Sequence, residues 1–317
     1  MKPTFSIIFF TVISGAGLGL LSLLALADVC PVDTLPRAAF TTGIALAFAL
    51  IVVGLASSTL HLAKPSNAWR AFSRFRTSWL SREAVFAAAL VGVTLLYGGS
   101  VASDARGAIR IPIAVVTSAL CCAVLFCTAM IYASLKPIRQ WHTRWTPANY
   151  LLLGHWSGAL GLLALAFAYD ARPMPFVWLA LAVGVVALAV KLAYWRAIGD
   201  DTHAVTLERA IGVREGVRPP ATTVAQARLF DAGHSHGTFL TNEFGFRVAR
   251  KHATLVRVCA LLLAFGIPAV AFASGTRSAG LVALVAALCV VGLFAERWLF
   301  FAEARHTVRL YHGDARA

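Results

Sequence analysis

His61 and Glu83 are the residues of this sequence whose types and spacing best suit proton chemistry. A loop of about twenty residues separates them, and each borders a long apolar run. Such a loop returns the chain to one membrane depth, where an imidazole and a partly buried carboxyl group can both exchange protons. A His–Glu pair beside an apolar crevice suits a quinol, whose oxidation releases two protons with two electrons. The structural alternative is a capping histidine and a glutamate at a helix start, favoured by the helix macrodipole.

The loop between these two residues is rich in basic and aromatic side chains. On a helical wheel its aromatic residues share one arc, whereas Arg70 and Arg74 point the opposite way and Arg76 falls inside the arc. The arc contains Trp69, Phe72, Phe75, Trp79 and Leu80. This pattern predicts an interfacial amphipathic helix. Its basic residues either contact anionic lipid or form a docking surface for a soluble subunit, and Arg76 needs a partner or must reach water.

A second aromatic and basic segment follows at 132–150. Lys136, Arg139 and Arg144 alternate with Trp141 and Trp145 there, which is typical of an anchor at a membrane interface.

A few ionisable residues fall inside apolar runs. His155 would need a second histidine, with His61 as the only candidate, to bind haem as a bis-His ligand pair. Glu296 and Arg297 are expected to form a local charge pair, and Lys191 to extend toward the membrane surface. The six cysteines lack CxxC spacing. We therefore expect them to act as small apolar residues, with no haem, iron–sulfur cluster or metal in this chain.

The elements that must position these residues are membrane-spanning helices. The chain has 317 residues, of which 59% are hydrophobic and 13% charged, whereas about 25% charged residues is usual for soluble domains. Runs of about twenty apolar residues can each span a bilayer. We predict an all-α integral membrane protein with eight spans, near 5–27, 39–61, 84–103, 111–134, 147–169, 175–196, 254–273 and 278–300. The first run resembles a signal peptide but exceeds the usual length of its apolar core.

The distribution of charge predicts the orientation. In the eight-span arrangement, 23 of the 28 Lys and Arg residues fall on the side of both termini. The positive-inside rule therefore predicts cytoplasmic termini, a cytoplasmic loop at 62–83 and a long cytoplasmic loop at 197–253. The net charge of +14 lies in loops between spans, which argues against nucleic acid as a partner.

The residues resemble a known family over nearly the whole chain. The most specific part is "LHLAKPSNAWRAFSRFRTSWLSRE", supported by "FSIIFFTVISGAGLGL" and by "WTP" at 145–147. The chain resembles the membrane-anchor subunits of dimethyl sulfoxide reductase-type molybdoenzyme complexes. The segments "YASLKPIRQWH" and "EFGFRVARKHA" are closer to the branch associated with quinone-coupled sulfite dehydrogenase.

This resemblance implies a quinone-binding anchor that holds an iron–sulfur electron-transfer subunit and, through it, a molybdopterin catalytic subunit at a bacterial inner membrane. It places the quinone site on His61 and Glu83. We further expect Arg76 to help orient the quinone head group or seat the partner, and Arg70, Arg74, Lys136 and Arg139 to help dock the partner. Ala63, where the family commonly has glycine, and the long 197–253 loop depart from the pattern. A small-solute transporter is the alternative, and a cytochrome b-type haem protein is a third.

Overall fold

The computed structural model describes residues 4–30, 35–59, 65–105, 107–199 and 248–312. Within these residues eight helical segments are long and apolar enough to cross a membrane, which confirms the eight predicted spans. They are α1 (Phe5–Val29), α2 (Arg37–Thr59), α3 (Trp79–Ala102), α4 (Gly107–Ala133), α5 (Trp145–Ala168), α6 (Met174–Gly199), a segment made of α9 (Val248–Leu261), η4 (Leu262–Gly266) and α10 (Ile267–Ala273), and α11 (Ala279–Ala302). Two short 3₁₀ helices, η1 (Pro65–Arg74) and η5 (Thr307–His312), lie outside the spans.

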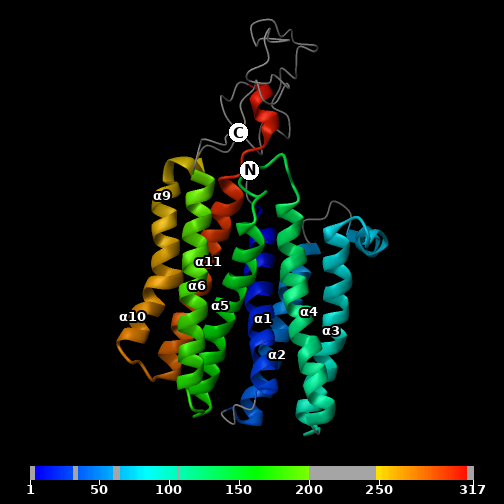
Figure 1. Ribbon diagram of the computed structural model, residues 1–317, viewed down its shortest axis with the longest axis vertical. Helices are drawn as coiled ribbons and strands as arrows, with labels where there is room; N and C mark the ends of the chain where they lie inside the picture. The colour runs from blue at the N-terminus through cyan, green and yellow to red at the C-terminus, as the bar shows by residue number, and fades with distance from the viewer. Residues whose placement is uncertain (1–3, 31–34, 60–64, 106, 200–247, 313–317) are drawn as a thin grey trace, which may run out of the picture.

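The spans form one elongated bundle (Figure 1). The start of α1 and the end of α11 lie at the same end of it, which we call the terminal end. The opposite end carries the turns between α5 and α6 and between α10 and α11, together with the end of α1, the start of α2, the end of α3 and the start of α4. The predicted long loop falls mostly on residues 200–247, which lie outside the described residues, while α6 continues to Gly199 and α9 already begins at Val248.

Helix α1 occupies the centre of the bundle and is the most buried of the spans. It packs against α2, α4, α5 and α11. The segment contributes much of the core, including Leu21 and Leu24, and its interpretation as a retained membrane helix rather than a signal peptide stays a prediction.

Glycines allow α1 and α5 to approach with their backbones almost in contact. A Cβ atom on Gly19 would lie 1.9 Å from the carbonyl oxygen of Gly154, and one on Gly158 would lie 2.3 Å from the carbonyl carbon of Gly19. Small residues spaced four apart are a common means of packing membrane helices, since apolar burial alone drives little association in lipid. The contact therefore depends on the absence of side chains at these positions.

The seventh span is interrupted in its middle. The π-helical turn η4 precedes Pro268, which has no N–H to donate to the carbonyl of Ala264 four residues earlier. The indole Nε1 of Trp156 donates to that carbonyl instead, at 2.9 Å, and its ring stacks on Phe265. The interruption falls within the span predicted at 254–273, and Pro268 and its indole partner account for it.

The basic loop after α2 differs from the predicted amphipathic α-helix. Residues Pro65–Arg74 form the 3₁₀ helix η1, a turn follows, and α3 begins at Trp79 rather than near residue 84. Ser78 caps α3 by accepting a hydrogen bond from the backbone N–H of Ser81. Three residues per turn still align Trp69 with Phe72, and both side chains are exposed, as expected of a surface that meets lipid.

Candidate functional site

Glu83 lies inside the bundle near its terminal end. The residue is 5% exposed, although it sits only one turn into α3. The hydroxyl of Thr128, from the neighbouring helix α4, donates a hydrogen bond to Glu83 Oε1. Among the described residues no Lys, Arg or His lies within ion-pair distance of this carboxyl group. A buried carboxyl group oriented by one hydroxyl and lacking a cation is suited to accepting and releasing protons.

The structure counts against one structural alternative for Glu83. A glutamate that stabilises the macrodipole would lie in the first turn, but no acidic residue occupies the first turn of α3. The carboxyl group instead faces α4 through Thr128. The helix macrodipole therefore does not account for the position of Glu83.

Arg82 holds the turn that joins η1 to α3. Its guanidinium donates to the carbonyl oxygens of Phe75, at 3.0 Å, and Arg76, at 2.8 Å, and it lies 4.1 Å from the ring centroid of Trp79. A planar guanidinium with several donors can hold two carbonyls and stack on an aromatic ring at the same time. The turn is thereby fixed directly before Glu83.

This turn leaves a group of arginines on the surface at the terminal end. Arg70, Arg74 and Arg76 are all exposed, and we call them the basic surface. Arg76 contributes only its backbone carbonyl to the contact with Arg82. The guanidinium of Arg76 is therefore accessible, and its assignments to a quinone or to a partner stay predictions.

The second predicted docking pair lies at the same end, in the α4–α5 connection. Lys136 is exposed. Arg139 is half-buried and its Nη2 donates to the carbonyl oxygens of Ala197 and Ile198, both at 3.4 Å. These carbonyls belong to the last turn of α6, where cationic side chains are favourable. Arg139 thus also has a structural role within the chain, and docking by either residue stays a prediction.

The connection between α4 and α5 is tied to the segment after α11. Ile138 pairs with His306 in an isolated antiparallel bridge, the Arg305 N–H donates to the Gln140 side chain, and Trp141 Nε1 donates to the Phe300 carbonyl at 2.8 Å. These contacts order the α4–α5 connection at the terminal end.

His61 lies outside the described residues, as do Leu62, Ala63 and Lys64. The predicted pairing of His61 with Glu83 therefore stays a prediction. The described chain resumes at Pro65 and reaches Glu83 through η1 and the turn that Arg82 holds.

A buried ion cluster departs furthest from what the sequence predicts. Lys191 Nζ pairs with Glu296 Oε1, and Arg297 Nε lies 3.2 Å from the other oxygen of Glu296. The expected local pair of Glu296 and Arg297 is confirmed, but the prediction that Lys191 extends to the membrane surface is wrong, since Lys191 is 1% exposed. The sequence did contain one indication of this pair, because Lys191 and Glu296 lie at similar distances from the ends of their helices.

An aromatic cluster separates Glu83 from these ions. Tyr132, one turn after Thr128, stacks on Tyr150 with ring centroids 5.9 Å apart, and the guanidinium of Arg297 lies 3.9 Å from the Tyr150 ring centroid. Contacts among Tyr132, Tyr150 and Arg297 thus join α4, α5 and α11 near the terminal end. Polar side chains inside a membrane domain are costly and often functional.

His155 belongs to a separate polar group deeper in the bundle. Its Nε2 lies 3.1 Å from Ser22 Oγ and 3.9 Å from Cys122 Sγ, and its Nδ1 lies 2.8 Å from the Leu151 carbonyl oxygen. Ser22 in turn contacts Ser118 at 2.9 Å. Both ring nitrogens therefore have partners within the chain, which satisfies the polar group without a ligand.

Two comparisons with known proteins identify the family of this chain. The family of DMSO reductase anchor subunits (DmsC) matches residues 1–302. The chain belongs to this family. It is also similar to a sulfite dehydrogenase subunit from Allochromatium vinosum, with 33% identity over 334 aligned positions that cover 98% of this chain and 99% of that protein.

Membership of the DMSO reductase anchor family confirms the resemblance predicted from the sequence. The chain is thus a multi-pass membrane protein and the anchor subunit of a molybdoenzyme complex. The similarity to a sulfite dehydrogenase subunit agrees with the predicted branch. The small-solute transporter alternative finds no support in either comparison.

Proposed function

We propose that this chain is the quinone-reactive anchor of a sulfite-oxidising molybdoenzyme complex in a bacterial inner membrane. Glu83, with His61, hydrogen-bonds the quinone head group near the start of α3, at the terminal end of the bundle. Support comes from the buried, cation-free Glu83 carboxyl group directly after an exposed basic surface. The similarity to the sulfite dehydrogenase subunit from Allochromatium vinosum supports the choice of sulfite.

The basic surface and the ordered α4–α5 connection would receive the partner. An iron–sulfur subunit seated on Arg70, Arg74 and Lys136 brings its nearest cluster toward the Glu83 region, and the molybdopterin subunit lies beyond it. Arginines are favoured at protein interfaces, and complementary charge guides association. The excess of Lys and Arg at this end supports a cytoplasmic location for it, and so for the complex.

The chemistry balances without a metal in this chain. Oxidation of sulfite to sulfate with water releases two electrons and two protons in the catalytic subunit. Two electrons reach the quinone through the iron–sulfur subunit, and two protons from the same side complete the quinol. Glu83 and His61 would pass those protons. A site on the cytoplasmic side would take up protons where sulfite oxidation releases them and so would move no net charge across the membrane.

Purification of the natural complex tests this proposal. An affinity tag on this chain should recover an iron–sulfur subunit and a molybdopterin subunit, with reduced-cluster signals in electron paramagnetic resonance. The purified complex should reduce a short-chain ubiquinone when sulfite is added. Recovery of the chain without partners contradicts the anchor role, and quinol-dependent reduction of dimethyl sulfoxide without sulfite activity contradicts the choice of substrate.

A further inference from the structure

A large cavity in the described part of the molecule lies at the end opposite Glu83. It has a volume of about 610 Å³ and is bordered by α5, α6, α10, α11 and the turns between them. Its wall is mainly apolar and includes Leu163, Phe167, Val177, Phe272 and Val282. This volume falls in the range of pockets that hold small molecules. The cavity is independent of the proposed quinone site.

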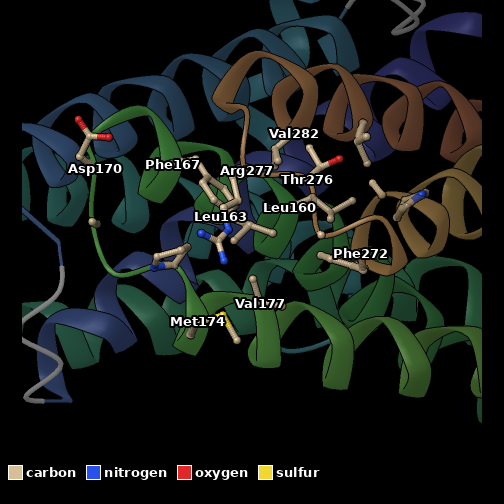
Figure 2. Close-up of a pocket in the computed structure, with 16 residues that line it drawn as sticks. Leu160, Leu163, Phe167, Asp170, Met174, Val177, Phe272, Thr276, Arg277 and Val282 are labelled. Carbon is tan, nitrogen blue, oxygen red and sulfur yellow. The ribbon is translucent and has the colours of Figure 1, made fainter.

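One exposed cation, Arg277, borders this apolar space. Figure 2 shows the Arg277 side chain reaching into the cavity near Leu163, whereas the carboxylate of Asp170 points elsewhere. Among the described residues, Arg277 has no hydrogen-bond or ion-pair partner. A guanidinium without a partner beside apolar surface is a recognition element for an anionic oxygen group, with phosphate as a geometrically favourable choice.

The apolar surface continues from the cavity toward the middle of the bundle. A smaller hollow of about 90 Å³ shares Phe272 with the cavity and extends along α6 to Leu188, beside Trp156. From Met174 to Leu188 the helix rises about 21 Å, a distance comparable with an extended acyl chain. The groove therefore combines a cation at a helix end with a long apolar path.

The interruption of the seventh span accounts for this groove. Pro268 lines the cavity, and η4 immediately precedes α10. In Figure 1, α10 diverges from α6 toward the opposite end. The bonding of Trp156 to the Ala264 carbonyl stabilises the bend. The groove is thus a consequence of the bent seventh span.

We propose that this cavity binds one anionic phospholipid, with its phosphate on Arg277 and an acyl chain along α6 and α10. The charge complementarity of a single unpaired guanidinium favours an anionic lipid over a zwitterionic one. A bound lipid would fill the gap between the α5–α6 pair and the bent seventh span. Neutral quinone lacks the charge that Arg277 would recognise.

Native mass spectrometry of the purified complex, titrated with dioleoylphosphatidylglycerol or dioleoylphosphatidylcholine, tests the site. The wild-type complex should bind one phosphatidylglycerol about tenfold more tightly than phosphatidylcholine, because the choline cation of phosphatidylcholine offsets the attraction between its phosphate and Arg277. Arg277→Gln should remove that preference. Arg172→Gln is the matched control, because Arg172 is an exposed arginine in the neighbouring turn and does not line the cavity.

A second variant distinguishes the cavity from the nearby surface. Val177→Trp fills the apolar space while Arg277 remains, and it should also weaken binding of phosphatidylglycerol about tenfold. Unchanged binding in Arg277→Gln, or in folded Val177→Trp, overturns the proposal. Equal affinity for phosphatidylcholine, or a copurified quinone displaced by Val177→Trp, would equally overturn it.

Discussion

Lys191 of α6 and Glu296 of α11 form an ion pair that is almost fully buried inside the bundle. Arg297 contacts the second carboxylate oxygen of Glu296 at 3.2 Å and lies over the Tyr150 ring. The cluster joins α6 to α11 near the end where a soluble partner is proposed to bind. Its two cations share one anion, so the removal of that anion leaves both without a charge partner.

Glu296→Gln should therefore destabilise the protein strongly. Breaking a buried pair by removing one partner costs about 3–5 kcal/mol. The measurement is thermal unfolding of the detergent-solubilised chain. Lys136→Gln is the control, because Lys136 is exposed at the same end, and it should change stability little. Equal thermal stability of the two variants would show that the buried ion cluster does not stabilise the protein.

Gly19→Ala should disrupt the contact between α1 and α5. The added Cβ would lie 1.9 Å from the Gly154 carbonyl oxygen, and overpacking of this kind costs about 1–3 kcal/mol or more. Gly99→Ala is matched to it, because a Cβ at Gly99 of α3 meets nothing within 4 Å. The yield and thermal stability of the two variants in mild detergent are the readouts. A Gly19→Ala protein as stable as Gly99→Ala would be inconsistent with the close packing.

Glu303, which follows α11, should give the chain a pH-dependent stability. Burial raises the pKa of Glu303 above its ordinary 4.5, although Arg257 opposes this shift. The folded state therefore holds this proton more tightly than the unfolded state, and the associated stability is present at low pH and is lost as pH rises above about 4.5. Unfolding midpoints of wild type and Glu303→Gln, measured across this range, should converge at low pH and differ in slope above it. Parallel curves would contradict the shift.

Thr128 should act on quinone turnover through Glu83. Thr128→Val keeps the shape of the side chain but removes the hydroxyl that donates to the Glu83 carboxyl group, so quinone-linked turnover should fall and its pH profile should shift. Thr128→Ser restores the hydroxyl and should restore both. A loss shared by Val and Ser variants would indicate a packing effect instead.

The helices were predictable because their apolar length is a local property. The start of α3 was not predictable, since the charged residues Arg82 and Glu83 interrupt the apolar run, yet Ser78 caps a helix that already includes them. The basic loop was predicted as an α-helix from its aromatic spacing. Arg82 folds back onto the carbonyls of Phe75 and Arg76, a tertiary contact that a helical wheel does not contain.

The candidate site was predictable only in part, for the same reason. Glu83 stood out as a carboxyl group at a span edge, but its partner Thr128 depends on which faces of α3 and α4 meet. Lys191 is close enough to the end of α6 to reach the surface. It pairs inside the bundle because α11 presents Glu296 at the same depth, and that depth requires the packing of two helices far apart in sequence.

The ratio of quinone-linked to dye-linked activity in a Glu83→Gln complex tests the central claim most directly. The variant keeps the size and the hydrogen-bonding capacity of the side chain but cannot exchange a proton, and general acid–base groups contribute about 10²–10⁴-fold. Sulfite-dependent quinone reduction should fall at least about a hundredfold, with sulfite-dependent dye reduction unchanged. His61→Ala should show the same pattern, and the exposed Asp104→Asn control should not. Quinone reduction at the wild-type rate in Glu83→Gln would contradict the assignment of Glu83 to the quinone site.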